Sequence, residues 1–385
     1  MPNGVGRHLA AAVVVVALAG AVSACGRAGP SSTALTPTSS GISSGAPPSR
    51  RPNDIPQPPT SNVTLNGVGS TLPAPLLQVW LDRFTATYPN VSIAYDPRGS
   101  AAAIDGIAKS TAAFGATDAA MTDAEQAAVN AKVLHIPVAL GGIAVTVNLS
   151  DVPSLQLDAA TLASIFLGRI TRWNDPAIAA LNASMTLPDL PIAVVHRSDD
   201  AGATAAFTAY LDASSPAWHD GPGAGRTITW PTGAGAAGDD GITTAVKATK
   251  GAIGYAASPF TAEAGLRMVR LRNPAGNFVR PTPLGIGAAG ETSVAAMAAD
   301  LRTGPVVNAP GVNAYPIVVY AYLLVRADQA DRATGEALVA LLSWCLTSGQ
   351  ADAAQQGYGP LPGGVQARAL AALHGVTSGG AAIWP

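Results

Sequence analysis

The sequence predicts an α/β protein, and its length and charge limit the number of lobes and the kind of partner. Short apolar runs alternate with longer helical patterns from about residue 63 onwards. The chain has 385 residues, which is enough for two lobes or domains. Its formal net charge is only −2, which gives no electrostatic reason to expect nucleic acid as a partner. The alternation favours a mostly parallel sheet, in which ligands bind where strands end and helices begin.

The first 24 residues have the pattern of a signal peptide. Arg7 and His8 precede an apolar run over 9–19 that is too short to span a membrane as a stable helix. The stretch "VSAC" then ends at Cys25 and resembles the lipobox of bacterial lipoproteins, whose cysteine becomes the acylated N-terminus. An ordinary secretory signal with an incidental cysteine is the alternative. We expect a fatty acid such as palmitate at Cys25 and a location on the extracytoplasmic face of the cell membrane.

Residues 25–61 predict a disordered tether. They are mostly Ser, Thr, Pro and Gly, and such a composition cannot bury enough apolar surface to fold. A polar, proline-containing segment of this kind suits a folded body that is held away from a membrane.

The body begins at residue 62, and its elements follow from local patterns. Pro176 comes just after Asn174 and Asp175, where a proline favours the first turn of a helix. The expected strands are 63–65, 91–95, 133–137, 143–148 and 192–195, and the expected helices are 74–88, 101–110, 159–166, 176–181 and one that starts at about 203.

Cysteine and histidine usage gives no support for a metal or another cofactor. Cys345 lies in an apolar helical pattern, and its only partner candidate is Cys25 in the lipobox, so we expect a buried free thiol. The sequence has no CxxC, no HExxH and no cluster among its five histidines. We therefore expect no cofactor.

One stretch predicts an anion site. In "VVHRSDDAGATAAFTAYL" (194–211) an apolar strand runs through a loop of small residues with one arginine into an amphipathic helix. The first N–H groups of a helix are free, and its dipole is positive at that end, so such a loop attracts anions. Three other loops, 66–80, 96–107 and 113–122, also place Ser, Thr or Asp where a strand ends. Ordinary N-capping explains any one of them alone, but four together predict a converging pocket.

Seven segments resemble the phosphate-binding protein of the bacterial ABC phosphate importer, the PstS type. They run in order over about 64–362: "GVGSTLPAPLLQVW", "FGATDAAMT", "GRITRWNDPAIAALN", "IAVVHRSDDAGATAAFTAYL", "GAIGYA", "YPIVVYAYLLV" and "GYGPLP". The resemblance implies a two-lobed periplasmic-binding-protein fold of type II, with 62–138 plus 318–385 as lobe 1 and 139–317 as lobe 2. Two crossover strands would join the lobes, and the apolar runs 139–148 and 315–325 suit that role.

The resemblance also implies the ligand and its contacts. The chain would capture inorganic phosphate, deliver it to a membrane permease, act as a monomer without enzymatic activity, and close on its ligand by a hinge. Asp199 would orient the arginine of the site. The ligand-binding positions carried over from the family are Thr71, the Leu72 N–H, Ser100, Asp118, Arg197, Ala201, Gly202 and Ala203.

The chemistry of two of these residues fits phosphate independently. Arg197 offers a planar fork that matches two oxyanion oxygens. Asp118 would accept a hydrogen bond from a protonated phosphate, whereas sulfate has no proton to give and would leave the buried carboxylate unpaired.

The arginine loop departs from the family pattern. Ala201 stands where a ligand-binding serine is expected, Ala203 where some relatives have threonine, and Asp200 where a glycine is expected. Each lost hydrogen bond to a charged ligand weakens binding by roughly 1.5–3 kcal/mol. Thr204 compensates only if it reaches the site, and Asp200 is either a solvent-facing turn residue or a charge that lowers oxyanion affinity.

Two alternatives follow from these departures. A degenerate relative would bind another small oxyanion, or would act as a sensor or surface protein without transport. An enzyme such as a phosphatase would use the arginine loop and Asp118 for phosphoryl chemistry, but the sequence offers neither a metal cluster nor a nucleophile–base pair.

Overall fold

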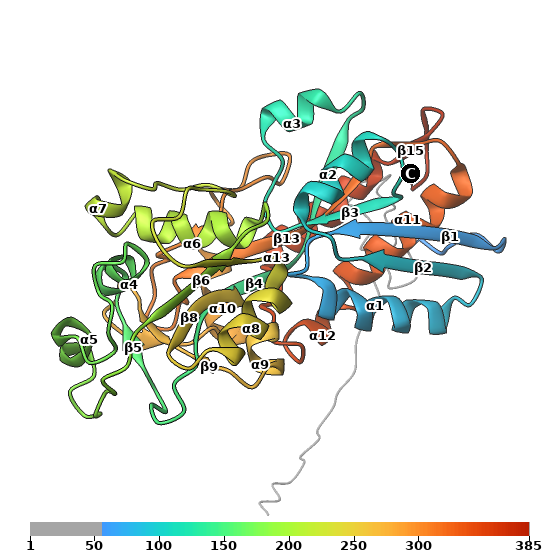
Figure 1. The fold of residues 1–385 in the computed structure, drawn as a ribbon. Coiled ribbons are helices and arrows are strands. Elements are labelled where there is room, and N and C mark those ends of the chain that lie inside the picture. The colour runs from blue at the N-terminus through green and yellow to red at the C-terminus, as the bar shows by residue number, and fades with distance from the viewer. Residues whose placement is uncertain (1–55, 385) are drawn as a thin grey trace, which may run out of the picture. The chain divides into compact units, whose positions relative to one another are not determined.

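A mixed β-sheet runs through the computed structural model, which describes residues 56–384 (Figure 1). These residues belong to one compact unit. The strands of the sheet are β1 (Val63–Gly69), β2 (Val91–Asp96), β3 (Phe114–Thr117), β4 (Val133–Val147), β6 (Ala193–Arg197), β7 (Ala234–Ala236), β8 (Ala252–Ala257), β9 (Arg267–Met268), β12 (Val306–Val307) and β13 (Ile317–Arg326). Two small sheets hold β5 (Gln156–Leu157), β10 (Arg270–Arg272) and β11 (Phe278–Val279), and β14 (Asp328–Gln329), β15 (Thr377–Ser378) and β16 (Ala381–Ala382).

The strand order is β2-β1-β3-β13-β4-β8-β6-β7, with β12 beside β13 and β9 beside β4. The two flanks are parallel, because β1 pairs in parallel with β2 and β3, and β6 with β7 and β8. The centre is antiparallel, from β3 through β13 and β4 to β8. The expectation of a mostly parallel sheet is therefore wrong for the centre, because the chain crosses there on two long strands that run in opposite directions.

Helices cover both flanks of the sheet (Figure 1). The helices are α1 (Ala74–Thr87), α2 (Ser100–Ala108), α3 (Asp123–Ala128), α4 (Ala159–Phe166), α5 (Pro176–Leu181), α6 (Gly202–Asp212), α7 (Pro216–His219), α8 (Gly238–Ala248), α9 (Ser258–Glu263), α10 (Pro283–Glu291), α11 (Arg332–Leu346), α12 (Gln350–Ala353) and α13 (Gly363–Ala372), followed by a 3-10 turn (Leu373–Gly375). We call the part that contains β1–β3 the first lobe and the part that contains β6–β8 the second lobe.

Several helix starts follow from capping side chains. Thr122 and Glu125 form a capping box at α3, in which each side chain binds the other residue's backbone N–H. Asp158 caps α4 and Asp331 caps α11. At α5, Asp175 caps and Pro176 occupies the first turn, as the sequence predicts. Such ends depend on neighbours in sequence, which is why local patterns indicate them.

The crossing strand β4 is longer than the sequence patterns indicate, whereas β13 is close to the expected run over 315–325. β4 is continuous over Val133–Val147, where two separate strands were expected. It pairs with β13 from Val133 opposite Arg326 to Gly142 opposite Val318, with an irregularity between Ala321 and Tyr322. Almost every residue of the pair is buried on both faces. Continuous apolar runs of this kind indicate a doubly covered strand but give no length.

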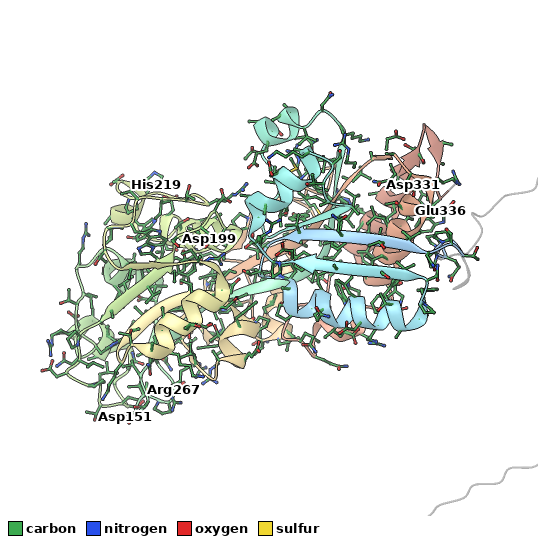
Figure 2. All side chains as sticks on the ribbon, turned by 45° about the vertical axis from the view of Figure 1, so that its right-hand side comes forward. Asp151, Asp199, His219, Arg267, Asp331 and Glu336 are labelled. Atoms are coloured by element: carbon green, nitrogen blue, oxygen red, sulfur yellow. The ribbon has the colours of Figure 1, made fainter. Side chains whose placement is uncertain are left out.

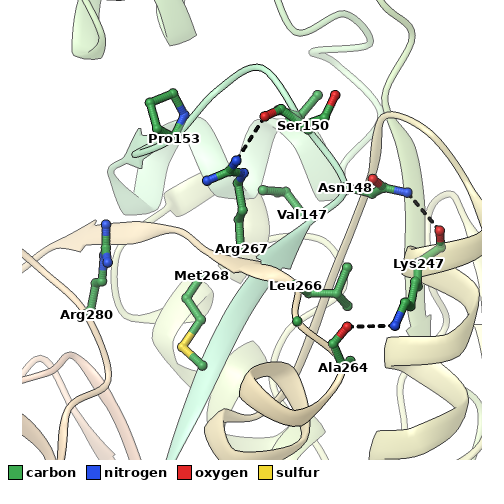
Figure 3. Close-up of a pocket in the computed structure, with 12 residues that line it drawn as sticks. Val147, Asn148, Ser150, Pro153, Lys247, Ala264, Leu266, Arg267, Met268 and Arg280 are labelled. Atoms are coloured by element: carbon green, nitrogen blue, oxygen red, sulfur yellow. Dashed lines mark hydrogen bonds between the residues drawn. The ribbon is translucent and has the colours of Figure 1, made fainter.

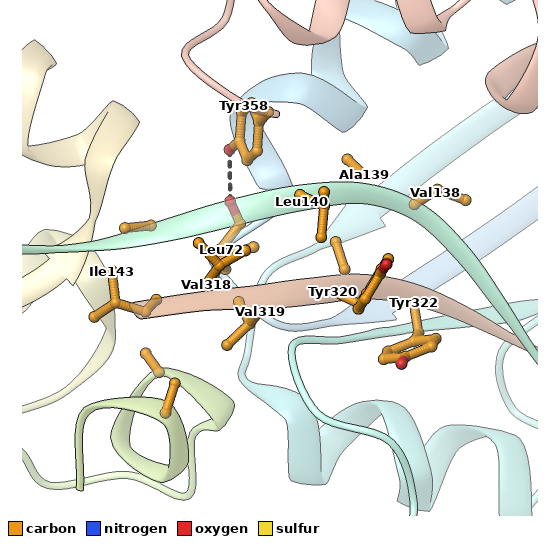
Figure 4. Packing of buried hydrophobic residues seen from close by; sticks show 14 of the residues in the cluster. Leu72, Val138, Ala139, Leu140, Ile143, Val318, Val319, Tyr320, Tyr322 and Tyr358 are labelled. Carbon is orange, nitrogen blue, oxygen red and sulfur yellow. Dashed lines mark hydrogen bonds between the residues drawn. The ribbon is translucent and has the colours of Figure 1, made fainter. Parts of the chain in front are cut away.

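The core around this crossing also holds the loop between β1 and α1 (Figure 4). The Tyr358 hydroxyl donates to the Leu72 carbonyl oxygen over 2.6 Å. A Cβ atom at Gly141 would lie 2.9 Å from the Leu72 side chain, so any larger residue there would require Leu72 to shift. The crossing strands and a C-terminal tyrosine therefore hold the β1–α1 loop in place.

The outcome of the remaining sequence predictions is as follows. Cys345 is a free, fully buried thiol whose pKa is raised by burial. Within residues 56–384, no helix combines the length and apolarity that crossing a bilayer requires. The signal peptide, Cys25 and the tether up to residue 55 lie outside the described residues, and the lobe boundaries at 138/139 and 317/318 remain predictions.

Candidate functional site

The N-terminus of α6 is bound by a carboxylate from the other lobe. Asp118 follows β3, and its Oδ1 accepts from the Gly202 N–H over 3.0 Å while its Oδ2 accepts from the Ala203 N–H over 2.9 Å. The Ser100 hydroxyl donates to the same Oδ1 over 2.5 Å. Asp118 and Ser100 are both 2% exposed. Four predicted ligand-binding residues thus lie together, and an internal carboxylate occupies their donors.

Close packing at this point requires glycine. A Cβ atom at Gly202 would lie 2.3 Å from the Asp118 carbonyl oxygen and 2.7 Å from the Asp118 carboxyl carbon. The backbone of the α6 N-terminus therefore touches the end of β3 directly. Free N–H groups and the helix dipole favour a negative charge there, which explains why a carboxylate sits at this position.

Arg197 ends β6 and is only 3% exposed. Its Nε and Nη2 donate to both oxygens of Asp199 over 2.7 and 2.6 Å, which is the bidentate arrangement that fixes a guanidinium plane. Burial opposes the charge on Arg197, but Asp239 and Asp199 raise its pKa above the ordinary value. Burial also raises the pKa of Asp199, but the hydrogen bond and the charge of Arg197, together with the Gly238 N–H, outweigh it and lower that pKa.

The third nitrogen of Arg197 is left open. Nη1 is buried and has no hydrogen-bond partner among the described residues. It lies 3.4 Å from Oδ1 of Asp239, close enough for charge attraction but without a hydrogen bond. Leaving a donor of a charged group unpaired in the interior is costly, so this nitrogen points to a missing acceptor.

Asp239 is a site residue that the sequence reasoning missed. It is fully buried in the first turn of α8, where its Oδ1 accepts from the Ala257 N–H over 2.7 Å. Its Oδ2 accepts from the Thr71 hydroxyl over 2.6 Å, across the two lobes. A signal was present, because the buried residues of α8 are Asp239, Ile242, Thr243 and Val246, which is the spacing of one helix face.

The remaining predicted residues of the first loop have partners within the protein. Thr71 is 7% exposed and donates to Asp239. The Leu72 N–H, predicted as a ligand donor, donates to the Ser70 hydroxyl oxygen over 3.1 Å. Thr71 therefore joins the arginine cluster, whereas the Leu72 amide is already engaged.

The departures in the arginine loop have distinct surroundings. Ala201 is the N-cap residue of α6, 1% exposed, and gives the helix no side-chain cap. Thr204 does not replace the missing hydroxyls, since its Oγ1 bonds the Tyr255 hydroxyl over 2.8 Å. That tyrosine oxygen also accepts from the Arg197 N–H over 3.2 Å. Thr204 and Tyr255 thus support the backbone behind the arginine.

Asp200 is neither a free turn residue nor part of the anion cluster. Arg226 donates to Asp200 through Nε over 2.7 Å and to Glu125 through Nη1 over 2.8 Å. Glu125 belongs to α3 beside the first lobe, and Arg226 to the segment between α7 and β7 in the second. The extra negative charge of Asp200 is therefore balanced within an ion network that spans the two lobes.

The site lies where the lobes meet, and other surface features lie elsewhere. Figure 2 shows Asp199 between the two lobes, far from Asp331 and Glu336 on the first lobe. A separate pocket beside Arg267 and Lys247 contains no predicted site residue, and both cations donate to backbone carbonyls there (Figure 3). Among residues 56–384, no group of three or more His, Cys, Asp or Glu is arranged to hold a metal ion.

Comparison with known sequences finds one family model and several relatives that are phosphate-binding proteins. A family model described as a PBP superfamily domain matches residues 54–348. The phosphate-binding protein PstS of Xylella fastidiosa (strain Temecula1) is 33% identical over 305 residues, which is 79% of this chain and 83% of the relative. The phosphate-binding protein PstS 3 of Mycobacterium tuberculosis (strain H37Rv) is 35% identical over 324 residues, 81% of this chain and 86% of the relative.

Solved structures share the fold. A high-affinity periplasmic phosphate-binding protein (PfluDING), bound with phosphate, has a TM-score of 0.65 at 23% identity and covers 80% of this chain and 93% of its own. A human phosphate-binding apolipoprotein has a TM-score of 0.65 at 20% identity, over 80% and 94%. The type II periplasmic-binding-protein fold is thereby confirmed. Since the family model and the relatives each cover more than three quarters of its length, the chain belongs to the PBP superfamily and, within it, to the PstS family of phosphate-binding proteins.

Proposed function

We propose that the chain is an extracytoplasmic solute-binding lipoprotein that captures inorganic phosphate between its two lobes and delivers it to an ABC importer. The family consists of solute-binding proteins, so the arginine and carboxylates of the cluster are assigned to binding rather than to phosphoryl transfer. One observation carries the choice of an anion: the buried Nη1 of Arg197, a charged donor without a hydrogen-bond partner in the described part of the chain.

The donors around Asp118 support the same ligand. The N–H groups of Gly202 and Ala203 and the Ser100 hydroxyl converge on one carboxylate, a planar anion that can stand in for part of a phosphate. An entering phosphate would accept hydrogen bonds from these donors in place of Asp118. The Asp118 carboxylate would then accept a hydrogen bond from a phosphate hydroxyl. Sulfate has no such hydroxyl at neutral pH and would be rejected.

Calorimetric titration with phosphate and with sulfate tests this function. We expect the wild type to bind phosphate and to ignore sulfate. Asp118→Asn supplies an N–H donor in nearly the same shape and should narrow the gap between the two ions. Asp105→Asn, which changes an exposed carboxylate on α2 that pairs with Lys109, is the matched control and should leave both affinities unchanged. A wild type that binds neither ion contradicts the proposal.

The lipid anchor and the membrane location form the finer part of the proposal. They rest on the short apolar run over 9–19 and on the "VSAC" stretch that ends at Cys25. Cys25→Ser should release the protein from the membrane fraction of the producing cells, and unchanged membrane retention speaks against the anchor. We further propose that the protein acts as a monomer and that its membrane partner is a phosphate permease.

A second candidate function is the binding of a different small oxyanion. Two observations favour it: Ala201 and Ala203 lack the hydroxyls expected from the family, and Thr204 is engaged with Tyr255. Titration with a panel of tetrahedral and planar oxyanions, in the same buffer as the phosphate experiment, distinguishes the two candidates by the order of their affinities.

A further inference from the structure

Asp239 links the arginine of the site to the first loop. Its carboxylate is fully buried, and its two oxygens have different neighbours. Oδ1 accepts from the Ala257 N–H and lies 3.4 Å from the open Nη1 of Arg197. Oδ2 accepts the proton of the Thr71 hydroxyl over 2.6 Å. Any anion that binds Nη1 would therefore meet Asp239 and Thr71 as well.

The hydrogen bond to Asp239 determines what Thr71 offers to a ligand. A hydroxyl has one proton and two lone pairs. While the Thr71 proton is given to Asp239, the hydroxyl presents only lone pairs, so it accepts hydrogen bonds and donates none. Asp118 is likewise an acceptor when ionised. Two acceptors facing one phosphate require two P–OH groups.

The balance of charge favours the same form of the ligand. One guanidinium, Arg197, is shared by three carboxylates: Asp118, Asp199 and Asp239. A dianion would add two further negative charges to a cluster in which negative charge is already in excess, at short range and away from water. A monoanion lowers that cost.

We propose that Asp239 is a specificity-determining residue that makes the site bind phosphate as the dihydrogen monoanion. This inference rests on the proposed phosphate-binding function and names the ionic form of its ligand. Where the monohydrogen dianion is the main form in solution, binding takes up one proton from solvent, and the bound ion is the dihydrogen monoanion. The second proton lies on the phosphate oxygen that faces Thr71.

The titratable groups around Asp239 are consistent with a single extra proton. Burial raises the pKa of Asp239, against the effects of Arg197 and the Thr71 hydroxyl. The other titratable groups that act on or feel Asp239 are Asp118 at the end of β3 and Tyr358 ahead of α13, whereas the next residue of α8, Asp240, is exposed. Burial raises the pKa of Tyr358 far above its ordinary value, so this phenol stays protonated throughout the range of the experiment.

The dependence of phosphate affinity on pH tests the inference. Calorimetry from about pH 6 to about pH 9 spans the second ionisation of phosphate, and above that ionisation the association constant of the wild type should fall about tenfold per pH unit. In Asp239→Asn the amide donates to Thr71 and frees the hydroxyl proton for the ligand, so above that ionisation the affinity should become independent of pH. Asp240→Asn removes the exposed neighbouring carboxylate and should keep the wild-type slope.

A second variant tests the same inference if Asp239→Asn does not fold. Thr71→Val removes the hydroxyl that needs the second P–OH group, and should also flatten the pH dependence while circular dichroism shows a folded protein. Wild-type phosphate affinity that does not change with pH overturns the inference alone, as does a wild-type slope in folded Asp239→Asn. A wild type that binds no phosphate at any pH overturns the proposed function and this inference with it.

Discussion

At the scale of single residues, Arg197 is the group on which anion binding depends. Asp199 holds two of its nitrogens, and the third is buried without a hydrogen-bond partner. A charge-assisted hydrogen bond contributes about 1.5–3 kcal/mol, and this guanidinium offers its donors in a fixed plane. The arginine therefore combines fixed geometry with unused capacity.

Arg197→Ala should lower phosphate affinity at least about a hundredfold, because it removes the charge and leaves Asp199 and Asp239 without their cation. Arg197→Lys should recover only part of it, since an ammonium lacks the planar fork. Calorimetry measures both. Arg332→Ala, on the exposed side of α11, is the control. Near wild-type affinity in Arg197→Ala would mean that the anion binds elsewhere.

Ala201 tests whether the arginine loop has lost a ligand contact. Ala201→Ser adds a hydroxyl at the N-cap of α6 and should tighten phosphate binding by about 1–2 kcal/mol, since the backbone is already in place. The same hydroxyl can cap the helix, so urea unfolding should show a gain in stability of up to about 1 kcal/mol. Ala209→Ser, further along α6, should do neither. Unchanged phosphate affinity with tighter binding of another oxyanion supports the second candidate function.

At the scale of elements, an ion network connects α3 of the first lobe with the loops of the second. Arg226 bonds Asp200 just before α6 and Glu125 in α3. The Arg226 side chain is 15% exposed and that of Glu125 29%, so water screens the pair only in part. The backbone of the same arginine also accepts from the Ala201 N–H over 3.3 Å. The network therefore connects α3 of the first lobe to the arginine loop of the second lobe, and we expect it to stabilise the closed form.

Arg226→Glu should speed phosphate dissociation about tenfold, because two repelling carboxylates then face the new one and favour the open form. Stopped-flow dissociation measures this rate. The double variant Glu125→Arg with Arg226→Glu restores opposite charges at these two positions. Its rate of phosphate dissociation should therefore return most of the way to the wild-type value. Exchanging the exposed pair Arg332 and Glu336 should have no effect. Failure of the double variant to recover would show that the network does not hold the lobes closed.

At the scale of the whole molecule, His135 makes stability depend on pH. It is 2% exposed, and its Nε2 accepts from the Met121 N–H over 3.2 Å. Burial first, and then the charge of Arg302, lower the pKa of His135 from 6.5 to about 4. The unfolded chain therefore binds a proton at a higher pH than the folded protein does. The free energy of unfolding therefore decreases as pH falls from about 6.5 towards 4.

The expected loss from His135 across that window is about 3 kcal/mol. Urea unfolding at about pH 7 and about pH 4.5 measures it. His135→Gln keeps an acceptor for the Met121 N–H but cannot take up the proton, so its stability should fall less over the same interval. Carboxylates contribute equally to both proteins, so equal losses in wild type and variant would contradict this assignment to His135.

The family, the alternation of strands and helices, and the composition of the site loops are determined by the sequence. Caps such as Asp175 with Pro176, and the strand, loop and helix around Arg197, depend on residues that are close in the chain, so local patterns indicate them. The loop residues Ser100, Asp118 and Gly202 were predicted together for this reason and through the family resemblance.

Only the tertiary structure decided which groups meet. The bond between Thr71 and Asp239 joins residues 168 positions apart, and that between Asp118 and Gly202 joins residues 84 apart. The spacing of the buried residues of α8 puts Asp239 on one helix face, but such spacing cannot tell that Arg197 and Thr71 lie opposite it. Likewise, no local pattern pairs Arg226 with Glu125. The physical reason is that periodicity encodes which face of an element is buried, whereas its neighbours are set by how the crossing strands bring distant loops together.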